Sequence, residues 1–538
     1  MQIEFFGAAR TVTGSCHMLS FAGGKLLVDC GMRQGADAKG VYGESTFPFD
    51  PKAVEAVLLT HAHIDHSGLL PLLAKQGFAG KILCTGATAQ LATILLPDSA
   101  HIQEQEAEWQ TRKNARAGKP PVEPLYTVDD AQNALKLFHG VEYNEAVQLL
   151  PDVQVRLQDA GHLLGSAAAE IWVREDGKTT KVVFSGDVGR DDRPIIRDPQ
   201  DIHEADYLVL ESTYGNRNHP VSTDADKEAE LAAVIRGALA RGGNLVIPSF
   251  AVGRTQELLY YIKRLIKKNL VPGLENVPVY IDSPLGINAT KIYERCAEGY
   301  YDEEATAMAK DGSPFDFPTL RVAQTADDSK LINDDKAAKI IISSSGMCDA
   351  GRVRHHLKHN LYRADSTVLF AGYQAQGTLG RALIEGAKKV KLFGEEVRVN
   401  AAIVQMNGFS GHAGKDELIA WVANIAPPPA GIFLVHGEED ALNELGETLQ
   451  AGGHTIRIPA LGEAISLSAE TTARKVPLPP DVIDVNVKAY GYRAREEIRR
   501  IGELLDATDQ RRSPDMLLKI KILEADLKAL ADKWETLL

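Results

Sequence analysis

The feature that most constrains this chain is a run of metal-binding residue types placed directly after an apolar stretch, AVEAVLL, that has the character of a strand. The run reads Thr60-His61-Ala62-His63-Ile64-Asp65-His66-Ser67-Gly68. Two histidines two positions apart at a strand end project from the same face, so both can bind one metal, and after a tight turn Asp65 and His66 can face a second. Imidazole and carboxylate ligands suit zinc, with manganese or iron as alternatives. With only 15 histidines in 538 residues, a chance H-x-H-x-D-H is rare.

Three further candidate ligands follow later apolar runs: His162 in DAGHLLGSA, Asp187 in FSGDVG and His436 in FLVHGEED. Each precedes glycine or another small residue, the context in which a side chain is held at a strand end with backbone close by. Taken singly, each is more often a satisfied polar residue. Together with the histidine-rich run they complete a set of seven ligands.

Short apolar runs alternate with turns and helical stretches along the chain, which predicts an α/β protein. Residues 1–210 and 211–395 form two such blocks, and residues 396–476 form a third that is too short to be independent. The second block opens with DADKEAELAAVIRGALARGG, where the glycine pair predicts the end of a helix. Prolines in KVPLPPDVID indicate a linker to a helical extension over 477–538.

Composition excludes several classes of protein. The chain is 44% hydrophobic and 25% charged, which is ordinary for a globular protein, and its five scattered cysteines form no C-x-x-C pair. No signal peptide is visible and no segment approaches the roughly 18 apolar residues of a membrane helix, so we expect a cytoplasmic protein without membrane attachment. The net charge of −14 argues against a protein whose whole surface binds nucleic acid, but it is compatible with a local basic cleft.

The order of Asp29, the histidine-rich run, His162 and Asp187 resembles the metallo-β-lactamase superfamily, whose αββα sandwich holds two metals at one edge. The resemblance implies a ligand set divided between two Zn²⁺ ions, with Mn²⁺ or Fe²⁺ as alternatives. One ion would take His61, His63 and His162, the other Asp65, His66 and His436, and Asp187 would bridge them. Asp29, in LLVDCG, corresponds to an aspartate that orients a ligating imidazole.

The interval between Asp187 and His436 spans nearly half of the chain, so an extra domain must be inserted there. The inserted block resembles the β-CASP domain of RNA-processing nucleases. Its three motifs appear in order as Glu211 in LVLESTYG, His412 in FSGHAG and His436 in LVHGE, and segments 253–257, 282–286 and 344–347 also match. The resemblance covers roughly residues 1 to 470 and is similar to the cleavage and polyadenylation endonuclease subunit and its bacterial and archaeal relatives. A histidine at the third motif implies RNA as the substrate.

This resemblance implies a zinc-dependent ribonuclease that cleaves single-stranded RNA, as an endonuclease, a 5′-to-3′ exonuclease or both. Two metals would activate a hydroxide, with Asp65 and Asp187 supplying the anchoring negative charge. His412 is the candidate general acid, and Glu211 would keep it protonated because a neighbouring carboxylate raises a histidine pKa.

RNA must also be bound away from the metals. Small, glycine-containing turns such as Ser344-Ser345-Gly346 and Gly377-Thr378 can direct backbone N–H groups at phosphates, with Arg254 and Arg352 as charge partners. The basic run over 351–359 is either part of this RNA channel or a solvated helix face.

Two questions stay open from sequence alone. The last helical pattern carries a heptad stripe from Met516 to Leu537, which indicates either a homodimer interface or a helix docked on its own domain. The alternatives to a nuclease are a catalytically silent RNA-binding scaffold, separable by metal content, and a metallo-hydrolase of a small ester or thioester, separable by a small-substrate assay.

Overall fold

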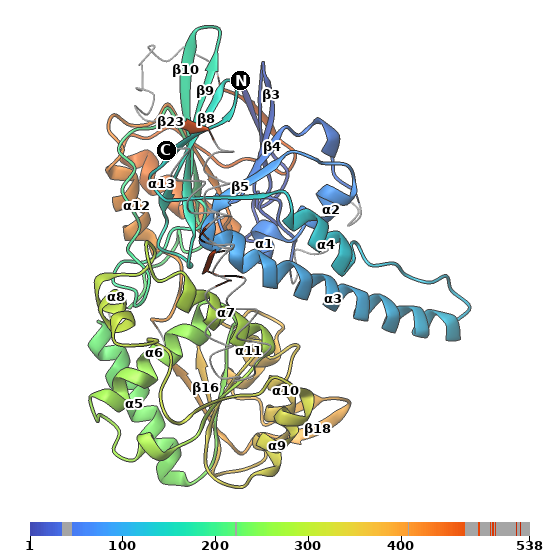
Figure 1. Ribbon diagram of the computed structural model, residues 1–538, viewed down its shortest axis with the longest axis vertical. Helices are drawn as coiled ribbons and strands as arrows, with labels where there is room; N and C mark the ends of the chain where they lie inside the picture. The colour runs from blue at the N-terminus through green and yellow to red at the C-terminus, as the bar shows by residue number, and fades with distance from the viewer. Residues whose placement is uncertain are drawn as a thin grey trace. The chain divides into compact units, whose positions relative to one another are not determined.

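The computed structural model describes residues 1–34, 46–220, 223–406, 408–467 and 482–484, together with residues 495, 498, 499, 501, 523 and 528. By contacts the chain divides into two units, Met1–Ile483 and Asp484–Leu538. The first unit contains all of the predicted ligands. It consists of a two-sheet sandwich and an inserted domain built on a third sheet (Figure 1).

The first sheet of the sandwich has seven strands in the order β22-β1-β2-β3-β4-β5-β6. Pairing is antiparallel from β22 to β3 and parallel from β3 to β6. Its strands are β1 (Gln2–Phe5), β2 (His17–Phe21), β3 (Gly24–Val28), β4 (Ala56–Leu58), β5 (Lys81–Thr85), β6 (Phe138–Val141) and β22 (Ala464–Ser466).

The second sheet has eight strands in the order β21-β20-β11-β10-β9-β8-β7-β23. Strands β10, β11, β20 and β21 pair in parallel, so their carboxyl ends lie at one edge. The strands are β7 (Ala146–Leu150), β8 (Val153–Asp159), β9 (Ala167–Glu175), β10 (Lys178–Phe184), β11 (Tyr207–Glu211), β20 (Gly431–Val435), β21 (Ile456–Arg457) and β23 (Val482–Asp484).

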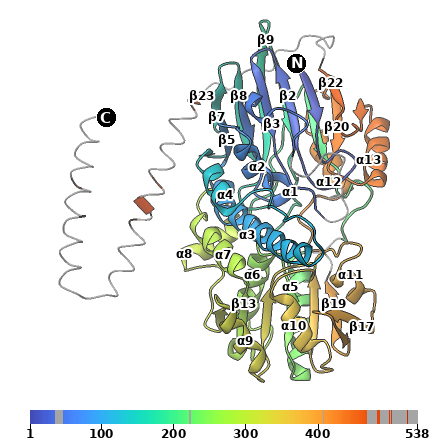
Figure 2. The same cartoon turned by 90° about the vertical axis from the view of Figure 1, so that its right-hand side faces the viewer.

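The two sheets pack face to face, with the Phe5 ring of β1 5.7 Å from the Phe433 ring of β20. Helices cover both outer faces, as Figure 2 shows. On the first sheet they are α1 (Ile64–Ser67), α2 (Leu70–Lys75), α3 (Gly86–Arg116) and α4 (Val128–Leu135), and on the second α12 (Lys415–Ala423) and α13 (Glu439–Ala451). The predicted αββα sandwich is thereby confirmed.

The inserted domain carries a six-stranded sheet in the order β14-β13-β15-β12-β16-β19, in which every pair is parallel. Its strands are β12 (Leu245–Pro248), β13 (Val279–Asp282), β14 (Leu320–Val322), β15 (Ile340–Ser343), β16 (Thr367–Ala371) and β19 (Ala402–Met406). Its helices are α5 (Asp224–Arg241), α6 (Arg254–Lys267), α7 (Pro284–Arg295), α8 (Glu303–Lys310), α9 (Ala326–Asp334), α10 (Val353–Asn360) and α11 (Leu379–Ile384), and β17 (Lys389–Leu392) and β18 (Glu395–Arg398) form a hairpin.

Local sequence accounts for where the first of these helices begins and ends. Thr223 and Asp226 form a reciprocal capping box at the start of α5. Gly242 ends it with a φ of 75°, a left-handed conformation that glycine adopts without the clash of a Cβ atom. The helix end predicted at the glycine pair is confirmed.

Two predicted domain boundaries need correction. Glu211 ends β11, which pairs with β10 and β20, so the first motif of the insertion lies in the sandwich and not on the inserted domain's first strand. Strand β19 pairs with β16, so the inserted sheet continues past residue 395 to Met406. Each strand is assigned by its hydrogen-bonded partner, which the apolar run of the strand itself does not specify.

The two domains share an apolar interface. Leu91 of α3 and Leu163, next to His162, belong to one buried cluster with Tyr260 of α6 and Tyr293 of α7. This packing fixes the metal-binding edge of the sandwich against the inserted domain.

The heptad stripe from Met516 to Leu537 lies almost wholly outside the described residues, and so does most of the predicted extension over 477–538. The homodimer and the cytoplasmic location stay predictions. Across the described ranges, every helix is too short or too polar to cross a membrane.

Candidate metal centre and active site

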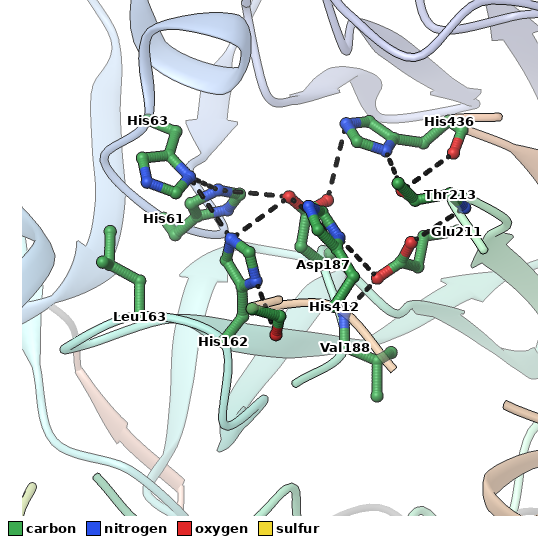
Figure 3. A network of polar contacts seen from close by, with 12 residues as sticks. His61, His63, His162, Leu163, Asp187, Val188, Glu211, Thr213, His412 and His436 are labelled. Atoms are coloured by element: carbon green, nitrogen blue, oxygen red, sulfur yellow. Dashed lines mark hydrogen bonds and ion pairs between the residues drawn. The ribbon is translucent and has the colours of Figure 1, made fainter. Parts of the chain in front are cut away.

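Seven predicted ligands converge from four separate loops at one edge of the sandwich. Figure 3 shows most of them arranged around Asp187. The histidine-rich run follows β4, and the later ligands each follow a strand of the second sheet: His162 after β8, Asp187 after β10 and His436 after β20. Strand ends thus deliver side chains that are distant in sequence to one place.

The first group consists of His61, His63, His162 and Asp187, whose candidate ligand atoms all lie within 4.8 Å of one another. His61 Nε2 is 3.0 Å from His63 Nδ1, which is 3.3 Å from His162 Nε2. Asp187 Oδ2 lies 3.5 Å from both His61 Nε2 and His162 Nε2. Three imidazole nitrogens and one carboxylate oxygen therefore point at a common position.

The second group consists of Asp65, His66 and His436. The Nε2 atoms of the two histidines are 3.3 Å apart, and His436 Nε2 is 3.8 Å from Asp65 Oδ2. Asp187 faces this group with its other oxygen, because Oδ1 lies 3.2 Å from His66 Nε2 and 3.6 Å from His436 Nε2. Asp187 stands between the two groups with one oxygen toward each.

Burial and charge at this edge fit divalent cations. Asp187 is 2% exposed, and its Oδ1 makes no hydrogen bond to any described residue, which is costly for a buried carboxylate unless a cation pairs with it. Burial raises the pKa of Asp187, but the surrounding imidazoles of His436, His66 and His61 hold it well below 3.8. Burial lowers the pKa of His61 and His162 well below 6.5, so both rings are neutral and free to ligate.

His66 differs from these rings. Burial lowers its pKa, but the carboxylates of Asp187 and Asp29 outweigh burial and raise it well above 6.5. A proton therefore balances the two carboxylates in the metal-free site, and a divalent cation would provide the same balance. The donor set of imidazole and carboxylate matches zinc.

Hydrogen bonds behind the ligands orient their rings. Asp29 Oδ2 is 2.7 Å from His66 Nδ1 and also accepts a bond from Thr60 Oγ1 at 2.9 Å, while Asp29 Oδ1 accepts one from the Thr60 amide. Thr213 Oγ1 lies 3.0 Å from His436 Nδ1, and the Gly411 carbonyl lies 3.2 Å from His162 Nδ1. In each case one ring nitrogen is bound from behind, which leaves Nε2 directed at the centre.

The backbone at two of these positions is in the left-handed region. The φ of Asp29 is 59° and that of His436 is 52°, each a conformation that costs a non-glycine residue roughly 1–3 kcal/mol. Backbone bonds hold both, from the Asp29 amide to Leu58 at 2.8 Å and from the His436 amide to Ala8 at 2.7 Å. The fold maintains this strain where the side chains must turn toward the centre.

Glu211 and His412 form a pair beside the centre. Glu211 is 1% exposed, and its Oε1 and Oε2 accept bonds from the Val188 and Thr213 amides. His412 Nδ1 is 3.1 Å from Glu211 Oε1 and 3.9 Å from Asp187 Oδ2, and its side chain is 20% exposed. Burial lowers the pKa of His412, but Glu211 and Asp187 outweigh burial and raise it to about 9. His412 is therefore a protonated imidazole that solvent and substrate can reach.

The two arginines predicted to meet phosphate each have an internal carboxylate partner, and their contact with RNA stays a prediction. Arg352 donates to Asp282 Oδ1 at 2.7 Å and to the Ala323 and Gln324 carbonyls, each at 2.9 Å. Arg254 is paired with Glu257, and its guanidinium lies 4.9 Å from the Phe409 ring centroid. Neither guanidinium is free to neutralise a phosphate without losing a carboxylate.

The predicted phosphate-facing turns lie at the carboxyl edge of the inserted sheet. Ser344, Ser345 and Gly346 directly follow β15, where Ser344 Oγ donates to Ser283 Oγ at 3.0 Å and Ser345 Oγ donates to the Ala350 carbonyl at 3.3 Å. Thr378 caps α11 and donates to the Ala375 carbonyl at 2.7 Å. Their hydroxyl groups shape these turns. The residues of the basic run over 351–359 have different surroundings. His356 is buried, and both of its ring nitrogens have hydrogen-bond partners. Arg354 and His355 lie beside the Phe393 ring.

Sequence reasoning missed three residues that support the centre. Thr60 directly precedes His61 and Thr213 lies two positions after Glu211, and the hydroxyl of each lies close to a ligand imidazole. Arg193 is paired with the His162 carbonyl and lies 3.9 Å from Glu257 of the inserted domain. Adjacency to a motif could have indicated the two threonines, but no sequence signal marks Arg193, since its partners come from distant loops.

Comparison with known proteins agrees with this geometry. Three family descriptions match consecutive parts of the chain: the metallo-beta-lactamase superfamily over residues 10–217, the Beta-Casp domain over 255–383 and the Zn-dependent metallo-hydrolase RNA specificity domain over 396–459. A protein named Ribonuclease TTHA0252 from Thermus thermophilus is 36% identical over 86% of this chain and 100% of its own length.

Two archaeal relatives are also similar. The Transcription termination factor FttA of Methanothermobacter thermautotrophicus is 32% identical over 83% of this chain and 69% of its own length. The RNase J-like protein of Methanocaldococcus jannaschii is 31% identical over 81% of this chain and 92% of its own length. With two ligand groups around Asp187 at the edge of an αββα sandwich and a β-CASP domain inserted beside them, the chain belongs to the β-CASP branch of the metallo-β-lactamase superfamily of metal-dependent hydrolases.

Proposed function

We propose that this protein is a zinc-dependent ribonuclease that hydrolyses phosphodiester bonds of single-stranded RNA. The observation that carries the proposal is the position of Asp187, with one oxygen toward each ligand group and the protonated His412 at its side. A site with two cation positions and an adjacent acid provides what phosphodiester hydrolysis requires, namely an activated water and a proton for the leaving oxygen.

The site would hold two Zn²⁺ ions, with Mn²⁺ or Fe²⁺ as alternatives. One ion would be held by His61, His63 and His162 and the other by Asp65, His66 and His436, with Asp187 shared between them. When bound, the metals supply Lewis acidity, which activates water and binds a phosphate oxygen. With both metals bound, the site would keep a net positive charge, because Asp65 and Asp187 are its only anionic ligands and the histidine ligands are neutral.

The chain's own residues keep that site rigid. Asp29, Thr213 and the Gly411 carbonyl each bind the rear nitrogen of a ligand imidazole, so the rings need no reordering when substrate arrives. Arg193 ties the His162 loop to Glu257, which connects the metal-binding edge to the inserted domain that would bind RNA.

His412 would protonate the leaving oxygen. Its Nδ1 faces Glu211, so the proton that it delivers is the one on Nε2, which bonds to no residue in the described part of the chain. Two backbone amides fix Glu211. Its carboxylate would stabilise the charged His412 imidazolium before the proton is transferred and would hold the neutral imidazole in the same orientation afterwards.

RNA as the substrate is supported by the relatives named ribonuclease and by the RNA specificity match over 396–459. The loops at the carboxyl edge of the inserted sheet, including Ser344–Gly346 and Thr378, would bind the strand. We propose that both endonucleolytic and 5′-to-3′ exonucleolytic cleavage are available to this site.

The test is a time course on a 5′-labelled single-stranded RNA beside the matched DNA, with a chelator control and the Asp187→Ala variant. We expect cleavage of RNA that chelator and Asp187→Ala both abolish. The product ladder distinguishes internal cuts from stepwise loss of 5′ nucleotides. A metal-loaded wild-type protein that cleaves no RNA would contradict the proposal, and hydrolysis of a small ester by that protein would favour the alternative hydrolase.

A further inference from the structure

Two large aromatic side chains are exposed at the carboxyl ends of neighbouring strands of the inserted sheet. Phe250 follows β12 and is 48% exposed, and Tyr373 follows β16 and is 46% exposed. Strands β12 and β16 are adjacent and parallel, so both rings stand at the same edge. Exposed aromatics of this size cost free energy in water, which makes their pairing at a functional edge informative.

Contacts connect Tyr373 to the candidate general acid. The guanidinium of Arg217 lies 5.8 Å from the Tyr373 ring centroid and 4.5 Å from that of Tyr214. The Tyr214 ring in turn lies 6.1 Å from the His412 ring. A continuous row of neighbouring aromatic and cationic groups therefore leads from His412 to the edge of the inserted sheet.

Phe250 joins this row through Gly346. Gln374, next to Tyr373, donates to the Gly346 carbonyl at 3.1 Å. A Cβ atom on Gly346 would lie only 3.0 Å from the ring carbon Cδ2 of Phe250, so the ring packs directly on this glycine. Phe250 and Tyr373 are thus the two ends of one local surface centred on the turn after β15.

Arg217 differs from Arg254 and Arg352 in whether a carboxylate pairs with its guanidinium. Arg254 and Arg352 are paired with Glu257 and Asp282. Arg217 is exposed, and no carboxylate oxygen of the described residues lies within 4 Å of its guanidinium. Arg217 can therefore neutralise a phosphate without breaking an ion pair to a described residue.

From this arrangement we infer that Phe250, Tyr373 and Arg217 form a binding site for the unpaired bases and the backbone of a single-stranded nucleic acid, with bases stacked on the two rings and a phosphate on Arg217. The inference rests on the proposed ribonuclease activity and names where the strand is bound beyond the cleaved bond. Aromatic stacking suits unpaired bases of any sequence, because every base has a π-face. The site therefore favours single strands without reading sequence.

The first test is steady-state cleavage of a single-stranded RNA by Tyr373→Ala, Tyr373→Phe and Tyr362→Ala. Tyr362 is 55% exposed at the amino end of β16, so it matches Tyr373 in type, strand and exposure but lies at the opposite edge. We expect Tyr373→Ala to raise KM roughly 5-fold to 100-fold with kcat within about twofold. Tyr373→Phe and Tyr362→Ala should leave KM unchanged.

Phe250 is tested in the same way with Phe250→Ala and the ring-retaining Phe250→Tyr. A 2-aminopurine base placed along the RNA reports stacking through its fluorescence, which would not change if Phe250 only supported the fold. Its fluorescence should be quenched on binding to the wild type and to Phe250→Tyr, and the quenching should be lost in Phe250→Ala. Thermal melting of each variant checks that the fold is retained.

Arg217→Gln tests the phosphate contact. Removing one phosphate contact to a single strand should reduce the slope of log affinity against log salt by about 0.7. Lys113→Gln, a cation on α3 beside Trp109, is the matched control and should leave the slope unchanged.

The outcomes separate this inference from the proposed function. If the wild type neither binds nor cleaves RNA, the ribonuclease proposal fails and this site fails with it. If the wild type cleaves RNA while Tyr373→Ala and Phe250→Ala keep wild-type KM and quenching, the stacking site alone is overturned. Equal effects of Tyr362→Ala and Tyr373→Ala would overturn it as well.

Discussion

Two buried aspartates at strand ends illustrate how similar positions serve different purposes. Asp187 follows β10 of the sandwich and is 2% exposed, and Asp282 ends β13 of the inserted sheet and is fully buried. Asp282 is saturated: Oδ1 accepts from Arg352 at 2.7 Å, and Oδ2 lies 2.6 Å from His356 Nε2 and is also bonded to Ser329. Asp187 is surrounded by imidazoles, yet its Oδ1 has no hydrogen bond among the described residues.

The difference lies in which group neutralises the carboxylate. The Arg352 guanidinium is a permanent cation, so the Asp282 cluster is complete without a ligand and fixes the loops after β13 and β15. The imidazoles of His61 and His162 beside Asp187 are neutral and supply lone pairs, so a bound divalent cation would take over the charge balance that the proton on His66 provides. Of these two aspartates, the one with an unsatisfied oxygen belongs to the site and the saturated one belongs to the scaffold.

The largest effect is expected from removing the unsaturated aspartate. Asp187→Ala should abolish hydrolysis and lower the bound metal, because both cation positions lose a shared ligand. Metal content by mass spectrometry and RNA cleavage are the measurements, and His63→Ala should behave alike. An Asp187→Ala variant that keeps two metals per chain would contradict the proposed difference between Asp187 and Asp282.

The next effect concerns the proton rather than the metals. His412→Ala should slow the chemical step by roughly 10²–10⁴-fold, as for the loss of a general acid, while the metal content stays at the wild-type level. Single-turnover cleavage beside metal analysis measures both. Full activity in this variant would show that His412 is not the acid.

A smaller effect is expected on the pH dependence. The acid form of His412 is present below its pKa, which Glu211 raises, so the rate should fall as pH rises through that pKa. Glu211→Gln removes a carboxylate that raises this pKa, so the fall should begin at lower pH, with little change on the acidic side. A pH–rate profile of kcat measures this, and an unshifted profile would contradict the assignment.

The smallest effect on catalysis is expected at the saturated aspartate. Asp282→Ala leaves the buried His356 and the partly exposed Arg352 without their partner, which should lower the free energy of unfolding by about 3–5 kcal/mol. Urea unfolding measures this loss, while metal content and kcat below the transition should match the wild type. Loss of metal in this variant would erase the distinction between the two clusters.

The candidate ligands could be identified from the sequence because part of their signal is local. The spacing of His61, His63, Asp65 and His66 follows from a strand end and a tight turn, and the structure brings the four together with His162, Asp187 and His436. The capping box and Gly242 likewise mark the bounds of α5 within a few residues of the chain. Such features need no knowledge of distant partners.

Partners from distant parts of the chain decided the rest. Arg352 lies in a basic run that suggests a free cation, but Asp282, 70 positions away, binds it. Arg217 carries no such signal, and no carboxylate of the described residues pairs with it. In the same way β11 and β19 belong to sheets that their own apolar runs do not specify. Sequence determined which residue types stand at strand ends, because backbone periodicity is local. Only the tertiary structure decided which charges are neutralised and which face a ligand, because electrostatic pairing depends on distance in space.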